Sequence, residues 1–214
     1  MPIPTQISST WEFLNGEVIW LHGRWSMYQQ LFGASERRIG YLNQVAPTFF
    51  YTLQVVLLDE VQLALSRLAD PASSGRRTNL TLESLAIEIQ QIPEPALHAD
   101  LIAALEAYRN KCERIIMRRN RRIAHYDRPT HVSAGDLPGA SREEIADALD
   151  ALRVCMRLVY QFYMNSYMAY EHFILNDDAN AIVRAAAEAL RYRELVETGV
   201  LDGLDFVSSR FARI

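Results

Sequence analysis

The sequence predicts an all-α protein, an antiparallel bundle of four to five main helices, and three observations support this. Apolar residues recur at spacings of three and four through most of the chain, which is the period of an amphipathic helix. No stretch shows the alternation of apolar and polar residues that indicates a half-buried strand. The 214 residues include only nine glycines, which is few for a sandwich or barrel with many tight turns.

The first two helices can be placed from their start and stop signals. A capping box, Ser9-x-x-Glu12, is expected to open the first helix, and Gly33 is expected to end it. The second helical stretch runs from about residue 35 to residue 68. Pro47 interrupts this stretch, so we expect a kink or a break there.

Loops and further helices follow. Residues 71–79 are predicted to form a loop, and the short helix behind it ends at Pro93. A long helix is predicted from about Pro95 to a point before Pro129. A second turn-rich loop is predicted for residues 129–140.

Two helices are predicted in the last third of the chain. A second capping box, Ser141-x-x-Glu144, opens a long helix whose apolar stripe extends to Phe173. The last helix is predicted over residues 179–197.

Length and composition fit one domain. We expect an N-terminal arm over residues 1–9, a single helical-bundle domain over residues 10–199 and a C-terminal tail over residues 200–214. Half of the residues are hydrophobic and 22% are charged, which excludes wholesale disorder. The net charge of −4 argues against a whole-surface grip on nucleic acid, so any such site must be local.

The sequence favours a cytoplasmic protein with no membrane partner. Cys112 and Cys155 cannot form a disulfide framework and are expected to be small buried side chains in a reducing compartment. No signal peptide is visible at the N-terminus. The longest membrane-span candidate, residues 149–170, is interrupted by charged and amide side chains.

The long helix that starts near Pro95 ends in a basic segment that carries the chemistry. Its apolar seam continues, by the same three-four spacing, onto Arg119. An arginine at a core position needs a carboxylate partner or a phosphate from outside. Asp59 and Glu60, which interrupt the apolar face of the second helical stretch, are the expected internal partners.

His125 follows in the same segment. Histidine can take and return a proton near neutral pH, and arginine can neutralise charge on a phosphoryl oxygen through its planar fork. Together the two side chains can cleave RNA without a metal. The base activates the ribose 2′-hydroxyl for attack on the adjacent phosphate, and the guanidinium stabilises the pentacoordinate state.

Arg119-Asn120 followed by four residues and His125 resembles the arginine-polar-x(n)-histidine motif of HEPN domains. An ordered set of further segments is similar to the AbiU2-type HEPN family, over roughly residues 10 to 170. These segments are Leu14-Asn15-x-Glu17-Val18, His22-x-Arg24-Trp25, Leu42-Asn43-x-x-Ala46-Pro47-x-Phe49-Phe50, Leu65-Ser66-Arg67-Leu68-x-Asp70-Pro71, Asn79-Leu80-Thr81-Leu82 and Arg119-Asn120-x-x-Ile123-Ala124-His125-Tyr126-Asp127.

The resemblance implies a HEPN-like helical bundle in which two protomers appose their motifs, and a metal-independent endoribonuclease that needs no cofactor and acts in abortive infection. By carry-over, Arg119 and His125 are the catalytic residues, and Asn120 orients the phosphate or the histidine. The neighbouring substrate-binding residues are expected to be Arg118, Arg122 and Tyr126. Some toxin members carry a modified tyrosine two places after the histidine, where this chain has Asp127.

Helix geometry leaves alternatives open for the arginine. At about 100° per residue, Arg119 and His125 lie about 120° apart on an ideal helix, whereas Arg118 shares a face with His125. Either the helix ends or distorts before His125, or the working pair comes from two chains, or Arg118 is the functional arginine. We favour Arg119.

Two further readings of the basic segment remain. One is a non-catalytic helical module of a toxin–antitoxin or defence system that binds RNA or a partner protein such as an antitoxin. The other is a purely structural bundle, in which an internal carboxylate fully occupies Arg119. Separately, Glu17, His22 and Arg24 on the first helix form either a second polar patch or ordinary surface and core groups.

Overall fold

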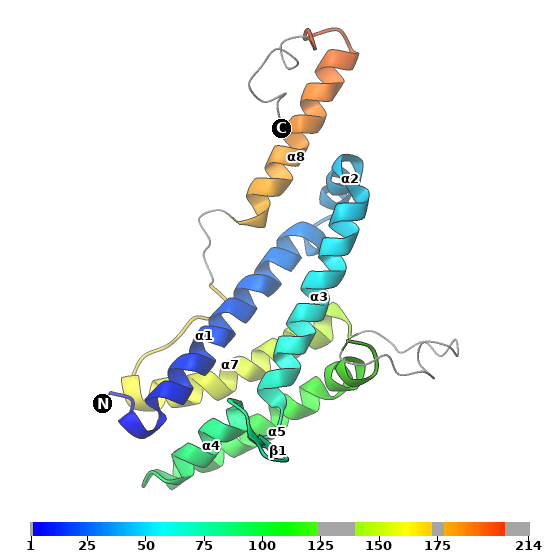
Figure 1. Ribbon diagram of the computed structural model, residues 1–214. Helices are drawn as coiled ribbons and strands as arrows, with labels where there is room; N and C mark the ends of the chain where they lie inside the picture. The colour runs from blue at the N-terminus through cyan, green and yellow to red at the C-terminus, as the bar shows by residue number, and fades with distance from the viewer. Residues whose placement is uncertain (1, 124–139, 173–177, 204–214) are drawn as a thin grey trace. The chain divides into compact units, whose positions relative to one another are not determined.

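A computed structural model describes residues 2–123, 140–172 and 178–203 of the chain (Figure 1). The described part is all-α apart from one two-stranded hairpin, which confirms the predicted fold class. The chain divides into two compact units, Met1–Trp25 with Leu57–Ile174 and Ser26–Val56 with Leu175–Ile214. The division of the chain into an arm, one domain over residues 10–199 and a tail stays a prediction.

The first unit contains most of the helices. It comprises the larger part of α1 (Thr5–Tyr28), the C-terminal part of α3 (Pro47–Ala69), and α4 (Leu82–Gln90), α5 (Pro95–Arg118) and α7 (Arg142–Met164). The second unit comprises the end of α1, a π-helical turn η1 (Gln29–Gly33), α2 (Glu36–Val45), the start of α3, and α8 (Ala179–Glu197).

Helix α1 begins earlier than its capping box predicts. It starts at Thr5, so Ser9 and Glu12 lie inside the helix and the predicted start was wrong. Ile7, within the added turn, is fully buried, and its amide donates to the Pro4 carbonyl at 3.1 Å. The burial of this apolar side chain makes the extra turn favourable. The helix ends at Gly33 as expected, through the π-helical turn.

Pro47 breaks the second helical stretch into two helices, as predicted. Ser35 caps α2 by accepting a hydrogen bond from the Arg38 amide. The chain leaves the helical conformation at Ala46, whose ψ of 75° suits the residue before a proline. Pro47 then occupies the first position of α3, where its missing N–H costs nothing.

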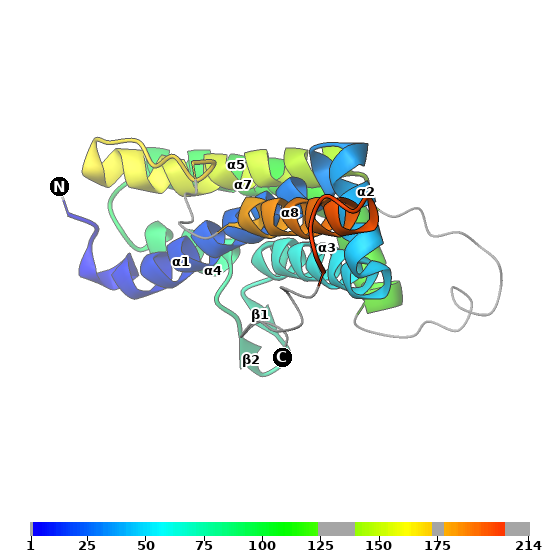
Figure 2. The same ribbon diagram turned by 90° about the horizontal axis from the view of Figure 1, so that it is seen from above.

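Helices α5 and α7 lie side by side and form the core of the first unit (Figures 1 and 2). The apolar seam of α5 is buried as predicted, and its members are Leu101, Leu105, Tyr108, Cys112 and Ile115. Cys155 of α7 is also buried, and burial raises the pKa of both the Cys112 and the Cys155 thiols to about 12. Both thiols are therefore neutral, as expected for small core side chains.

Helix α7 is shorter than its apolar stripe predicts. The capping box at Ser141 and Glu144 forms, with both hydrogen bonds present. The helix ends at Met164, however, and not near Phe173 as predicted. Asn165 adopts a left-handed conformation with φ of 47°, and its amide donates to the Gln161 carbonyl. Asparagine tolerates this conformation better than most residues, so it can end a helix without glycine.

The predicted loop at residues 71–79 contains a small hairpin, which the sequence did not reveal. Strand β1 (Ser73–Ser74) pairs antiparallel with β2 (Arg77–Thr78) across a turn at Gly75, whose φ is +62°. The Asn79 amide donates to the Ala72 carbonyl at 2.8 Å and closes the hairpin. Two-residue strands are too short to appear as an alternating pattern.

In the second unit α2 and α8 pack together, and their contact includes a polar link. One Arg38 guanidinium nitrogen donates to the Gln30 carbonyl at 2.9 Å and to the Asn180 side chain at 2.6 Å. Asp178 caps α8 through the Asn180 amide, and Gly199, with φ of +71°, follows the helix as predicted. The predicted loop at residues 129–140 falls almost wholly outside the described residues.

One described helix, α3, has the length and mean hydropathy of a membrane span. This helix differs from residues 149–170, which the sequence indicates as the longest candidate. The C-terminal half of α3 includes Val61 and Leu65, both fully buried in the first unit, and Asp59 and Glu60 in ion pairs. The apolar window of α3 is 28% buried, and one such helix is weak evidence for a membrane span because a core helix passes the same test.

Candidate functional site

The helical geometry of α5 changes at the residue where its seam turns polar. Helix α5 ends at Arg118, and residues Arg119–Ile123 continue it as a π-helical segment, η2. The α-helical geometry therefore distorts before His125, which is the first of the three alternatives; the other two stay predictions. Single π-helical turns within α-helices occur frequently at functional sites.

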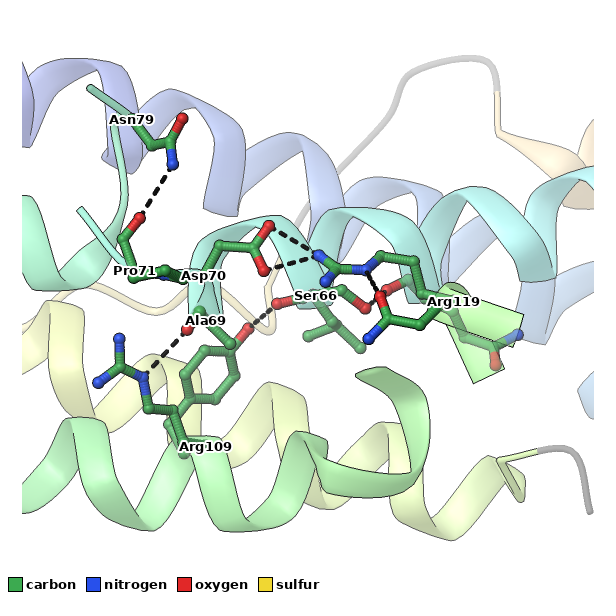
Figure 3. A network of polar contacts seen from close by, with 11 residues as sticks. Ser66, Ala69, Asp70, Pro71, Asn79, Arg109 and Arg119 are labelled. Carbon is green, nitrogen blue, oxygen red and sulfur yellow. Dashed lines mark hydrogen bonds and ion pairs between the residues drawn. The ribbon is translucent and has the colours of Figure 1, made fainter. Parts of the chain in front are cut away.

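Arg119 makes an ion pair at the C-terminal end of α3 (Figure 3). Its Nη1 donates to both carboxylate oxygens of Asp70, each at 2.7 Å, and its Nε donates to the Asn120 side-chain oxygen at 3.0 Å. The Arg119 side chain is only 16% exposed and that of Asp70 is 30% exposed. The expected requirement for a carboxylate partner is therefore confirmed, although the partner is neither Asp59 nor Glu60.

The two predicted partners bind other arginines. Asp59 accepts a hydrogen bond from Arg118 at 3.2 Å, and Glu60 accepts one from Arg24 at 3.1 Å. Neighbouring helix residues point about 100° apart, so Arg118 and Arg119 reach different parts of α3. Arg118 reaches its middle and Arg119 reaches its end.

Three hydrogen bonds fix the end of α3 that carries Asp70 (Figure 3). The buried Tyr108 hydroxyl donates to the Leu65 carbonyl at 2.6 Å, and the Arg109 Nε donates to the Ala69 carbonyl at 3.0 Å. The side-chain nitrogen of Asn79, Nδ2, donates to the Pro71 carbonyl at 3.0 Å. The Ala69 carbonyl is among the last four of the helix, which lack partners within it, so Arg109 satisfies it. The contacts to the Leu65 and Pro71 carbonyls fix the chain on either side of Asp70.

A second carboxylate extends this framework. Glu83 accepts from the Ala72 amide at 2.6 Å and from Arg109 at 3.4 Å. These contacts, the Ala72 hydrogen bond first, outweigh burial and lower the pKa of the Glu83 carboxyl. The segment that follows α3 is therefore tied back to α4 and α5 by charged groups.

Within the described residues, the Arg119 guanidinium has donors without a partner. Its Nε and Nη1 are occupied, whereas its Nη2 donates no hydrogen bond to any residue of the described part of the chain. A guanidinium has five N–H donors in a fixed fork, so the two donors of Nη2 can bind a phosphoryl oxygen while Asp70 holds Nη1. This arrangement orients the cation and reduces the cost of burying it.

The other predicted site residues differ in what the structure shows of them. Asn120 is exposed and lies against Arg119. Arg118 is 14% exposed in its side chain and pairs with Asp59, so the two arginines have different partners. Arg122 belongs to η2, whereas His125 and Tyr126 lie outside the described residues.

Asp70 is the site residue that the sequence reasoning missed as such. It was noted only as part of the Asp70-Pro71 helix stop and of the family resemblance. An acidic residue at the C-terminus of a helix is unfavourable to the helix dipole, and that local conflict was the available signal of a role in tertiary contact.

The polar residues of α1 do not gather into one exposed patch. Arg24 pairs with Glu60, whereas His22 is 5% exposed and stacks on Tyr170 with ring centroids 6.0 Å apart. Burial, and next the positive charge of Arg153, lower the pKa of His22 to about 4. His22 is therefore a neutral core side chain at physiological pH.

The described ranges contain no group of three His, Cys, Asp or Glu side chains arranged to hold a metal ion.

Comparison with known proteins identifies the family. The family model of the HEPN-domain AbiU2 proteins matches residues 9–182. No curated protein and no solved structure matches the chain significantly. The match spans most of the chain and includes the whole candidate site, so this protein belongs to the AbiU2 family of HEPN-domain proteins.

Proposed function

We propose that this protein is a metal-independent endoribonuclease that acts as a HEPN toxin in the cytoplasm. Its family membership indicates a HEPN-type role in abortive infection, a form of phage defence. The proposal adds the reaction: cleavage of RNA by attack of a ribose 2′-hydroxyl on the adjacent phosphate. RNA is the substrate, and no cofactor takes part.

The proposal rests on the state of Arg119. Asp70 accepts two hydrogen bonds of 2.7 Å from Nη1 of its guanidinium, and Nη2 makes no hydrogen bond within the described chain. A guanidinium fixed in this way needs little reorganisation when it binds a developing phosphoryl charge. Asn120, which accepts from the Arg119 Nε, supports the same orientation.

The reaction balances with two side chains. His125 removes the proton from the 2′-hydroxyl, the 2′-oxygen forms a bond to phosphorus, and the bond from phosphorus to the 5′-oxygen breaks. The leaving 5′-oxygen takes a proton from an imidazolium. The products carry a 2′,3′-cyclic phosphate and a free 5′-hydroxyl. Arg119 stabilises the pentacoordinate phosphorus, and Arg118, Arg122 and Tyr126 contribute to RNA binding.

We further propose a homodimer whose contact includes the N-terminal half of α3. Large apolar side chains are exposed on two faces of this half, with Phe49 (61%) and Val56 (56%) on one face and Tyr51 (68%) and Val55 (41%) on the other. The face of Phe49 and Val56 is the proposed contact. Exposed apolar patches of this kind mark association surfaces. F49E/V56E should convert a dimer into a monomer by light scattering, whereas I102E, at another exposed apolar position, should not. A wild-type monomer at micromolar concentration would contradict the dimer.

The function is tested with purified protein and a fluorophore-labelled RNA in the presence of a chelator. H125A and R119A should each abolish cleavage, because one removes the base and the other the phosphate contact. H172A and R114A are matched controls at exposed positions and should cleave as the wild type does. Activity that vanishes with the chelator, or that survives in H125A, would overturn the proposal.

A second candidate is favoured by the Asp70 contact. Because Asp70 partly neutralises Arg119, the basic segment could serve only to dock RNA or an antitoxin-like partner. In that case the wild type would bind RNA, as measured by fluorescence anisotropy, without cleaving it, and R119A would weaken binding. If H125A instead binds RNA as tightly as the wild type but no longer cleaves it, the ribonuclease is favoured over the binding module.

A further inference from the structure

A pocket of about 420 Å³ lies in the first unit between the hairpin and α4. Its lining includes Ala72, Thr78, Leu80, Ile87 and Glu88. The exposed surface of the lining is mainly apolar, with a few polar groups among it. A volume of this size and an apolar wall with few polar groups are typical of small-molecule sites.

The pocket adjoins the candidate site through the chain itself. Asp70 binds Arg119, and Ala72, only two residues further on, lines the pocket. Figure 3 shows Asp70 between Arg119 on one side and Pro71 and Asn79 on the other, and Asn79 also lines the pocket. A phosphate on Arg119 would therefore leave an adjoining nucleotide within reach of the pocket.

One pocket residue carries an acceptor without a donor. The Oε1 atom of Glu88 accepts from the Thr10 hydroxyl at 2.8 Å. Its Oε2 atom is buried and has no hydrogen-bond partner in the described chain. A buried acceptor without a donor is costly. Glu88 also lines the pocket, so a rotation of its side chain would bring this oxygen to a donor bound there.

The remaining walls suit a planar ring next to a phosphate. Leu80 and Ile87 are each about half exposed, at 51% and 50%, and offer apolar contact. Arg76 and Arg77, on the hairpin beside Thr78, are exposed and form no ion pair within the described residues. They supply positive charge for the neighbouring phosphates.

We infer that this pocket binds a nucleobase of the RNA substrate next to the scissile phosphate, and that Glu88 selects bases with an exocyclic amino group. This inference rests on the proposed ribonuclease function. Adenine, cytosine and guanine each carry an amino donor for a carboxylate oxygen. Uracil has no amino group, and its N3–H lies between two carbonyls that the carboxylate repels.

The test measures binding of the four ribonucleoside 3′-monophosphates to the full chain by calorimetry. AMP, CMP and GMP should bind about tenfold more tightly than UMP, because one charged hydrogen bond discriminates by about that factor. E88Q keeps the acceptor for Thr10 but adds a donor, so it should remove the difference. E12Q makes the same change of charge at an exposed position and should keep it.

Two further readouts keep the outcomes distinct. L80A, at a half-exposed wall position, should weaken the binding of all four nucleotides to the same extent. This variant replaces E88Q in the test if thermal unfolding shows that E88Q is not folded. Equal binding of all four nucleotides, or no binding at millimolar concentration, would overturn the pocket. Selective binding without any RNA cleavage would overturn the ribonuclease and leave the pocket standing. RNA cleavage without base preference and without nucleotide binding would overturn the pocket and leave the ribonuclease standing.

Discussion

The pair of Asp70 and Arg119 can be tested by its contribution to stability. D70N preserves the shape of the side chain but removes its charge, and it leaves a guanidinium that is 16% exposed without its counterion. Exposed pairs contribute about 0–1 kcal/mol, and breaking a fully buried pair costs about 3–5 kcal/mol. This pair is partly buried on both sides, so we expect D70N to lower the free energy of unfolding by about 1–2 kcal/mol.

The assay is urea unfolding followed by tryptophan fluorescence. All three tryptophans lie in α1 at positions 11, 20 and 25, within the same unit as Asp70, so the signal reports on that unit. The expected loss moves the unfolding midpoint by roughly half a molar urea. D147N, which removes an exposed ion pair between α5 and α7, should leave the midpoint nearly unchanged.

A double-mutant cycle with R119A completes this test. The coupling between D70N and R119A should account for most of the loss, because the two side chains contact each other directly. A D70N midpoint indistinguishable from that of the wild type, or two additive mutations, would refute the claim that Asp70 stabilises the buried guanidinium.

Three further predictions concern two core side chains and one helix end. The low pKa of His22, about 4, means that the unfolded chain binds the extra proton first as pH falls below about 6.5. Stability should therefore be complete above that pH and fall by about 3 kcal/mol towards pH 4, and H22F should flatten this dependence in urea titrations at several pH values. Y108F should cost about 1 kcal/mol because the Leu65 carbonyl loses its buried donor, whereas Y51F, at an exposed position, should cost nothing measurable. N165A should cost about 1 kcal/mol and N165G should not, because φ is positive there, and a thermal melt of both variants checks this.

The helices were predictable because their signals are local. The three-four spacing of apolar residues identified the buried seam of α5, and Pro47 and the Ser141 capping box placed a break and a start correctly. The start of α1 was missed because the burial of Ile7, a tertiary contact, extends the helix beyond its Ser9 signal. The end of α7 was missed because apolar residues continue past Asn165 in the sequence.

The candidate site was only half predictable for a related reason. Arg119 could be identified because a charge on a core seam violates the pattern. Its partner could not, because Asp70 is 49 residues away in sequence and Asp59 and Glu60, which interrupt the apolar face of the same helical stretch, also carry carboxylates. The choice among Asp59, Glu60 and Asp70 depends on where the ends of α3 and α5 meet, which only the packed structure determines.

The distribution of charge bears on how RNA would be held. The net charge of −4 gives no overall attraction, and Arg118 is already paired with Asp59. On the described surface near the end of α3, four exposed arginines form no ion pair within the described residues, and Arg119 adds its Nη2 donors. The four are Arg67, Arg76, Arg77 and Arg121. Five such contacts predict that the logarithm of the affinity for single-stranded RNA falls against the logarithm of salt concentration with a slope of about −3.5. Replacing Arg76 and Arg77 together by alanine should reduce that slope to about −2, and a wild-type slope steeper than about −5 would show that phosphates are held well beyond this cluster.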